Sequence, residues 1–263
     1  MDSRARADAL VRATLALADA SLRVAHLRGL IRDAPPGELA AGLEVLCARA
    51  EQVEPRAREC LVSLVDALAG NEPSLRAAVQ RLREEAAGES LLALERLLRS
   101  PLSASSLPPA EPPSKEYVPD YGKGRPLTLG ERKSLARKPD RDMLARLLLD
   151  PHPDVIHRLL ANPRLTEDDV IRLATKRPCR PEVLAEIVRS EKWLHRSRVR
   201  IAIVLNPSTP IDLGAPIVSL LMRQELKLVA EATAVAPLIR ALCIEHLERR
   251  PPVDFDDDDV RLQ

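Results

Sequence analysis

The stretch that decides the fold reads Val155-Ile156-His157-Arg158-Leu159-Leu160-Ala161-Asn162-Pro163. A second stretch, 44 residues later, repeats the pattern as Val199-Arg200-Ile201-Ala202-Ile203-Val204-Leu205-Asn206-Pro207. In both, a helical run of apolar residues leads into Asn-Pro. Because the proline ring disfavours the helical conformation in the residue before it, we expect each helix to end there. The two stretches therefore indicate a repeated helical unit.

Further helix starts lie on either side of these stretches. Arg180-Pro181-Glu182 and Lys138-Pro139-Asp140 are proline-led starts, at steps of roughly half the longer offset. Thr128 with Glu131, and Thr166 with Asp169, have the spacing of capping boxes. Each unit is then about one helix pair, which cannot bury its apolar face alone. The units are predicted to stack into a short α-solenoid.

One unit carries a resemblance to a known family. The residues Asp150-Pro151-His152-Pro153-Asp154-Val155, then Asn162-Pro163-Arg164-Leu165-Thr166 and Leu173-Ala174, resemble a unit of the leucine-rich repeat variant (LRV) family. The resemblance covers residues 135–248 at most. It implies a HEAT-like α-solenoid with a binding surface rather than a reaction. Some members of that family hold an iron–sulfur cluster through clustered cysteines, a feature this chain lacks, so we expect no cofactor.

The first hundred residues predict a helical bundle. Leu61, Leu64, Val65 and Leu68 follow helical spacing, and proline or glycine breaks divide the segment into about five helices. Short connections imply antiparallel neighbours. The sequence thus predicts an all-α protein with four parts: an N-terminal helical bundle (1–100), a Pro-rich extended linker (101–127), an LRV/HEAT-like α-solenoid (128–250) and an acidic disordered tail (251–263).

The linker contains seven prolines and, in its second half, both tyrosines of the protein. A pure spacer needs no aromatic side chain, so Tyr117 and Tyr121 are expected to dock, either on the chain's own solenoid or on another protein. The tail carries a run of like charges at 254–259, which favours disorder. A second hypothesis is that the tail covers the basic solenoid face in cis.

Composition places the chain among globular proteins. Hydrophobic residues make up 45% and charged residues 30%, whereas aromatics are only 2%, so the core must consist of Leu, Ala, Val and Ile. No apolar run reaches the roughly 18 residues of a spanning helix, and no signal peptide is recognisable. We expect no membrane insertion, a cytoplasmic location and a source compatible with a high-GC bacterium. The four cysteines are scattered among aliphatic residues, and we interpret them as buried reduced thiols.

No motif indicates catalysis. The histidines are isolated from one another, and His152 and His157 do not share a helix face, so no metal site is predicted. Asp168 and Asp169 stand at a helix start, where carboxylates favour the helix dipole. The segment Gly122-Lys123-Gly124-Arg125 lacks the spacing of a phosphate-binding loop. We expect neither catalytic nor cofactor-binding residues, and no enzyme activity.

The middle third of the chain is the basic part. Residues 113–200 contain 20 basic and 13 acidic residues, although the whole chain has a net charge of +1. Arg196, Arg198 and Arg200 cannot share one helical face, which favours a solvated surface over a phosphate-binding stripe. Trp193, the sole tryptophan, is either an interface anchor or a core residue.

These features predict a non-catalytic adaptor or scaffold that binds a protein partner through the solenoid face and the tyrosine-bearing linker. The alternative is a nucleic-acid or polyanion-binding protein that uses the same basic face. A homodimer through the N-terminal bundle is a further hypothesis. The predicted partner-binding residues are Tyr117, Tyr121, Arg172, Lys176, Arg177, Arg180, Trp193, Arg196 and Arg200.

Overall fold

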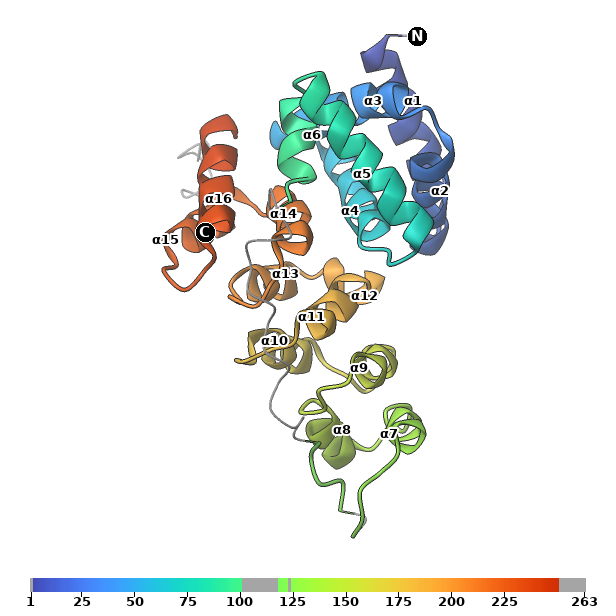
Figure 1. Ribbon diagram of the computed structural model, residues 1–263, viewed down its shortest axis with the longest axis vertical. Coiled ribbons are helices and arrows are strands. Elements are labelled where there is room, and N and C mark those ends of the chain that lie inside the picture. The colour runs from blue at the N-terminus through green and yellow to red at the C-terminus, as the bar shows by residue number, and fades with distance from the viewer. Residues whose placement is uncertain (1, 101–117, 123, 251–263) are drawn as a thin grey trace, which may run out of the picture.

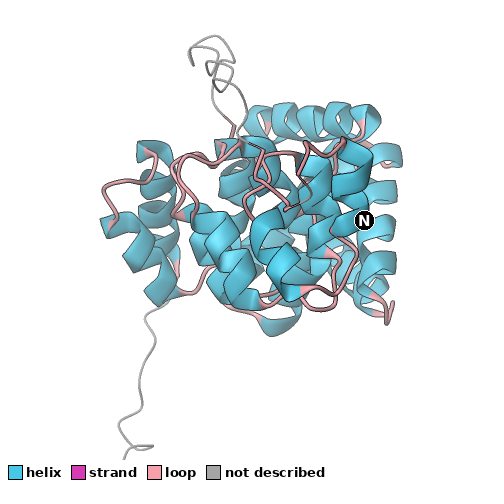
Figure 2. Cartoon of the chain, turned by 90° about the horizontal axis from the view of Figure 1, so that it is seen from below, coloured by secondary structure: helices cyan, strands magenta, loops and turns pink. Residues whose placement is uncertain are grey.

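The computed structural model describes residues 2–100, 118–122 and 124–250. They form sixteen α-helices and no strand, which confirms the prediction of an all-α fold (Figures 1 and 2). The N-terminal set consists of α1 (Ser3–Leu15), α2 (Ala20–Asp33), α3 (Pro36–Glu51), α4 (Pro55–Leu68), α5 (Pro73–Gly88) and α6 (Leu92–Leu97). The C-terminal set consists of α7 (Leu129–Leu135), α8 (Arg141–Leu147), α9 (Pro153–Leu160), α10 (Glu167–Thr175), α11 (Pro181–Val188), α12 (Glu191–Leu194), α13 (Ser197–Val204), α14 (Ile211–Leu220), α15 (Arg223–Glu231) and α16 (Pro237–Arg249).

Proline sets the start of three bundle helices. Pro36, Pro55 and Pro73 are the first residues of α3, α4 and α5, where the missing N–H removes no helical hydrogen bond. Six helices form instead of the predicted number of about five. The additional break lies before α2, where the Asp19 carboxylate accepts a hydrogen bond from the Ser21 N–H at 2.8 Å. Within the bundle α3 is central and packs against α1, α4, α5 and α6.

The solenoid helices stack in two rows. In the first row α7, α9 and α11 pack one upon the next, and in the second row α10, α13 and α15 do the same. Both predicted capping boxes form, at the starts of α7 and α10. Figure 1 shows the stack running from α7 and α8 at one end to α15 and α16 at the other.

The two Asn-Pro sites make equivalent hydrogen bonds. Asn162 donates to the carbonyl oxygens of Ala136 (2.8 Å) and Lys138 (3.0 Å), at the end of α7. Asn206 donates to two carbonyl oxygens at the end of α10, at 2.7 and 3.1 Å. Both asparagines are only 2% exposed, and each satisfies carbonyls that a helix end leaves free. The repeated asparagine therefore connects neighbouring helices: Asn162 joins α9 to α7 in one row, and Asn206 joins α13 to α10 in the other.

The bundle packs against the C-terminal half of the solenoid. α4 and α6 contact α14, and α4 also contacts α12. Arg58 donates to the carbonyl oxygen of Leu220 at 2.8 Å, and Arg189 donates to that of Ala69 at 2.9 Å. Buried apolar side chains from both helical sets join in one cluster. The bundle leaves one side of the solenoid uncovered, and we call the exposed surface of α8, α10, α13 and α15 the free flank.

Candidate interaction surface

The tyrosine-bearing segment docks on the chain itself. Tyr121 is 3% exposed, and its hydroxyl donates to Asp150. Arg132 binds both carboxylate oxygens of Asp150 at 2.8 Å. Burial raises the pKa of Tyr121, and the bond to Asp150 raises it further. This contact confirms docking in cis for Tyr121 and corrects its prediction as a partner-binding residue, because no part of the ring is free. Tyr117 lies outside the described residues.

Trp193 is also an internal side chain. It is 3% exposed, and its indole Nε1 donates to the carbonyl oxygen of Leu160 at 2.9 Å, at the end of α9. The ammonium of Lys192 lies 4.3 Å from the ring centroid. Of the two alternatives for this tryptophan, the core position is confirmed, and its prediction as a partner-binding residue is wrong. Its indole N–H thus satisfies a carbonyl oxygen at the end of α9, while its ring packs in the core.

Four of the predicted cations are engaged within the chain. Lys176 donates to a carbonyl oxygen just after α8 at 3.1 Å, Arg177 to one just after α13 at 3.0 Å, and Arg200 to one at the end of α12 at 3.2 Å. Arg180 pairs with Glu182 at 3.3 Å. Cations favour the carbonyl end of a helix. Three of these side chains thus bond carbonyl oxygens at or near helix ends, and the fourth makes a local ion pair. Their binding to a partner stays a prediction.

Ion pairs connect the start of α10 with the starts of α8 and α13. Arg141, at the start of α8, binds Asp169 of α10 at 2.5 and 2.8 Å. Arg198, at the start of α13, lies 3.1 Å from Asp168 of α10. Although burial alone would raise it, the hydrogen bonds from Arg141 and from the N-cap threonine lower the pKa of Asp169 to about 2. The free flank is thus tied along one edge by its own charges.

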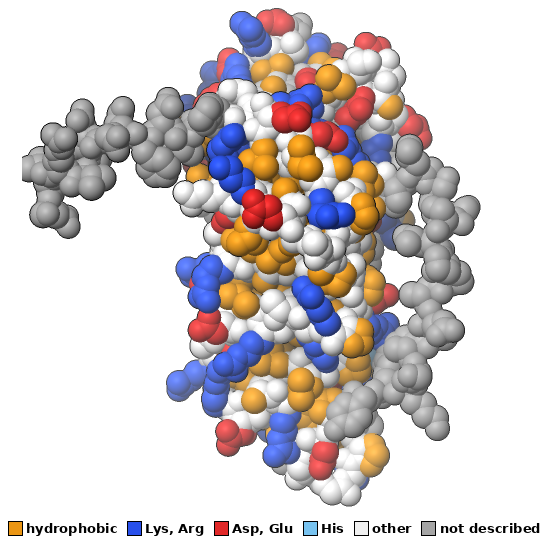
Figure 3. All heavy atoms as spheres, turned by 90° about the vertical axis from the view of Figure 1, so that its left-hand side faces the viewer, with side chains coloured by type: hydrophobic (Ala, Val, Ile, Leu, Met, Phe, Trp, Pro, Cys, Tyr) orange, Lys and Arg blue, Asp and Glu red, His pale blue; other side chains and the backbone are white. Residues whose placement is uncertain are grey.

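Two predicted cations stay available. Among the described residues of the predicted set, only Arg172 and Arg196 are exposed and have a side chain without a hydrogen bond or ion pair. They lie on α10 and just before α13, which are neighbours in the second row. Figure 3 looks onto this side of the molecule and shows basic side chains separated by apolar and uncharged surface. Leu149, after α8, and Leu228, on α15, are each 50% exposed.

A buried polar cluster joins the bundle to α14 and α16. Arg96 of α6 forms two bonds with Glu51 of α3, at 2.7 and 2.6 Å. His246 lies 3.5 Å from Glu51 and 3.3 Å from the Ser219 hydroxyl. Arg250 donates to the Ser219 carbonyl oxygen at 2.8 Å. Burial, together with the nearby arginine charges, lowers the pKa of His246 to about 3, so this imidazole is neutral.

Sequence reasoning missed this cluster. Its members come from α3, α6, α14 and α16, so no local spacing brings them together. One signal was present. Ile239, Leu242 and Cys243 define the buried stripe of α16, and His246 continues it at helical spacing. A polar residue on such a stripe needs a buried partner.

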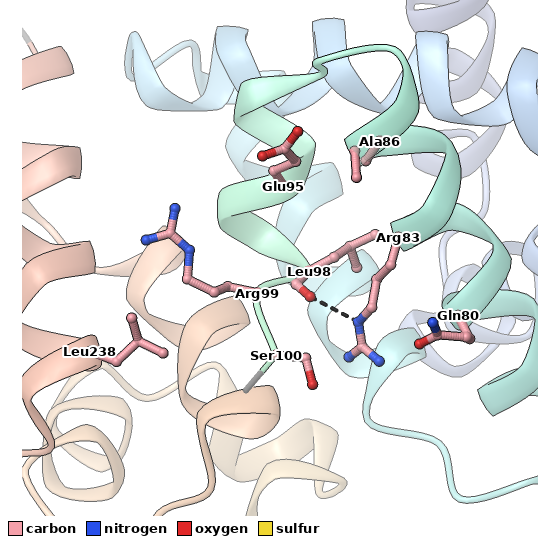
Figure 4. Close-up of a pocket in the computed structure, with 9 residues that line it drawn as sticks. Gln80, Arg83, Ala86, Glu95, Leu98, Arg99, Ser100 and Leu238 are labelled. Carbon is pink, nitrogen blue, oxygen red and sulfur yellow. Dashed lines mark hydrogen bonds between the residues drawn. The ribbon is translucent and has the colours of Figure 1, made fainter. Parts of the chain in front are cut away.

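A cavity of about 580 Å³ lies between the bundle and α16 (Figure 4). Gln80, Arg83, Leu98 and Ser100 line one side, and Leu238 lies across the opening. Arg83 donates to the carbonyl oxygen of Leu98 at 2.8 Å. Burial lowers the pKa of Arg83, whereas the negative charge of Asp212 raises it by a smaller amount. The cavity is thus lined by charged, polar and apolar side chains together.

The described residues form neither a metal-binding cluster nor a membrane-spanning helix. No three His, Cys, Asp or Glu side chains are grouped as a metal centre requires. Three of the four cysteines are buried thiols, as expected, and Cys179 is half-buried. Across the described segments, no helix combines the length and apolarity needed to cross a bilayer. No family model, curated protein or solved structure matches this chain. The resemblance to the LRV family stays a prediction.

Proposed function

We propose that the protein is a non-catalytic adaptor that binds a protein partner along the free flank of its solenoid. The proposal rests on a contrast between the charged and the apolar side chains of the free flank. Most of its cations are bound within the chain, whereas Leu149, just after α8, and Leu228, on α15, stand half exposed. Exposed apolar side chains with scattered charges are typical of protein-binding surfaces.

The chemistry of the flank favours a partner segment with aliphatic and acidic side chains. Leu149 and Leu228 offer apolar contacts near the two ends of the row, and Arg172 and Arg196 offer free guanidinium groups between them. Arg172 lies on α10 and Arg196 directly precedes α13, and an ion pair between Asp168 and Arg198 connects these two helices, so little order has to be gained on binding. A cytoplasmic location and a bacterial source remain predictions that accompany this proposal.

Nucleic-acid binding is the alternative function. It is less favoured because most of the predicted cations already form hydrogen bonds or ion pairs within the chain. Phosphate binding gains its affinity from cations that are free to replace counterions. Of the predicted cations, Arg172 and Arg196 alone remain without a partner among the described residues. Readers of single strands also need aromatic side chains for stacking, and Trp193 is buried. We therefore expect only weak binding of nucleic acid.

Affinity capture from lysate with purified variants tests the proposal. The full chain, the Arg172→Glu/Arg196→Glu double variant and an Arg76→Glu control would be compared, each with and without nuclease. Arg76 is an exposed cation of α5, on the bundle. We expect a set of proteins that survives nuclease, is retained by the control and is lost by the double variant. Equal recovery on all three chains would contradict a role for the flank.

Titration against single-stranded DNA at several salt concentrations tests the alternative. For protein binding along the flank, we expect weak DNA affinity that changes little between wild type and the double variant. Tight binding with a steep loss on added salt, reduced by the double variant, would establish the nucleic-acid function instead.

A further inference from the structure

The outer face of α16 closes the stack and has no covering element among the described residues. Its inner face buries four side chains against α14 and α15. Its outer face exposes Pro237, Ala241, Ile244 and Glu248, which recur at helical spacing, and Ile244 is 49% exposed. Three of these four residues are apolar.

The two ends of the solenoid differ in how they are closed. At the first end, the Tyr121 hydroxyl donates to buried Asp150, which Arg132 of α7 also binds, and Arg146 of α8 donates to the Asp120 carbonyl oxygen at 3.3 Å. A terminal repeat needs a polar outer surface or a cover, because its outer face has no further repeat to pack against. The stripe of Pro237, Ala241 and Ile244 supplies no such polar surface, and no described residue closes this end as Tyr121 closes the other.

Two charges flank Ile244, and neither has a partner. Arg240 lies one turn before Ile244 and Glu248 one turn after it, and neither side chain forms an ion pair or hydrogen bond within the described residues. The Nε of Arg240 is buried without a hydrogen-bond acceptor. Eight residues of helix separate the two charges by about 12 Å, so they cannot pair with each other.

A second copy in antiparallel orientation satisfies both charges at once. Residues 240, 244 and 248 form an i±4 ridge, and such ridges pack together in the commonest class of helix pairs. With a two-fold axis at Ile244, Arg240 faces Glu248 of the partner subunit and Glu248 faces Arg240 of the partner subunit. The ridge is therefore self-complementary in charge and apolar at its centre.

We propose that a second copy of this chain covers the outer face of α16, about a two-fold axis at Ile244. This interface goes beyond the binding of a partner on the free flank and does not depend on it. It also differs from the predicted homodimer through the N-terminal bundle. The half-exposed aliphatic residues of that bundle, Leu22 and Leu92, stand on separate helices and form no comparable ridge.

Sedimentation velocity of the full chain, measured over a range of concentrations, tests the interface. We expect the wild type to dimerise, and Arg240→Glu or Glu248→Arg each to weaken dimerisation at least about tenfold, since each change replaces both attractive pairs with repulsive ones. The thermal midpoint of every variant verifies that its fold is retained. Arg76→Glu and Leu92→Lys serve as controls on the bundle and are expected to dimerise as the wild type does.

Mixing the two single variants gives the sharper test. In a mixed dimer, both pairs are again Glu opposite Arg, so an equimolar mixture should regain the dimer that neither variant forms alone. The Arg240→Glu/Glu248→Arg double variant should also dimerise by itself. Wild type that stays monomeric up to about 100 μM would overturn the proposal. So would a dimer that survives both single variants, or one that only Leu92→Lys disrupts.

Discussion

Acidification should destabilise this protein through His246. This imidazole is 1% exposed, at the junction of the bundle with α14 and α16. Burial is the main cause that lowers its pKa to about 3, and the charges of Arg250 and Arg96 lower it further. Glu51, 3.5 Å away, is itself bound by Arg96 through both carboxylate oxygens. The folded protein therefore holds this histidine neutral at pH values where an unfolded chain protonates it.

The sign and the magnitude follow from proton linkage. Between the unfolded pKa of 6.5 and the folded pKa of about 3, the unfolded state binds a proton that the folded state does not. The free energy of unfolding therefore falls as the pH falls through this window. At about pH 5, this single group should reduce the free energy of unfolding by roughly 2 kcal/mol relative to neutral pH.

Urea unfolding of the wild type and of His246→Gln, each near neutral pH and near pH 5, measures this effect. Glutamine keeps a hydrogen-bonding group near Ser219 but cannot be protonated. Contributions from other groups are shared by both chains, so the wild type should lose roughly 2 kcal/mol more than the variant on acidification. Equal losses in the two chains would refute the reasoning. His157→Gln, a change at a histidine whose side chain is 61% exposed, controls for the loss of an imidazole.

Three further outcomes are expected. Asn206→Ala should lower the free energy of unfolding by about 2–3 kcal/mol, because two buried carbonyls at the end of α10 lose their donor; a urea midpoint equal to that of the wild type would contradict the link. Tyr121→Phe should lower the free energy of unfolding by about 1–3 kcal/mol and speed amide exchange in α7 and α9, because buried Asp150 loses a donor. Unchanged exchange in these helices would count against docking in cis. Arg96→Ala should lower the free energy of unfolding by about 3–5 kcal/mol, because it leaves Glu51 buried without its ion pair. A thermal midpoint close to that of the wild type would show that the pair is dispensable.

Local features of this chain could be predicted from the sequence because they depend on residues within one turn of each other. Prolines at helix starts, and the threonine caps of α7 and α10, act through backbone groups three positions away or fewer. The Asn-Pro pattern likewise identified the repeat from residue type and spacing. The stacking of units then follows, because short amphipathic helices cannot bury their apolar faces alone.

The partners of charged and aromatic side chains were decided only by the tertiary structure. Arg96 and Glu51 are 45 positions apart, and Arg58 reaches a carbonyl 162 positions away, so no sequence period relates them. The basic residues of the middle third were visible in the sequence as a charge excess, but which of them are neutralised depends on how adjacent helices align. The sequence left Tyr121 to dock on the chain or on another protein, and Trp193 to be an interface anchor or a core residue. Only the packing shows that the contacts of both lie within the chain. Sequence spacing encodes contacts along one helix, whereas contacts between helices depend on how the rows and the bundle come together.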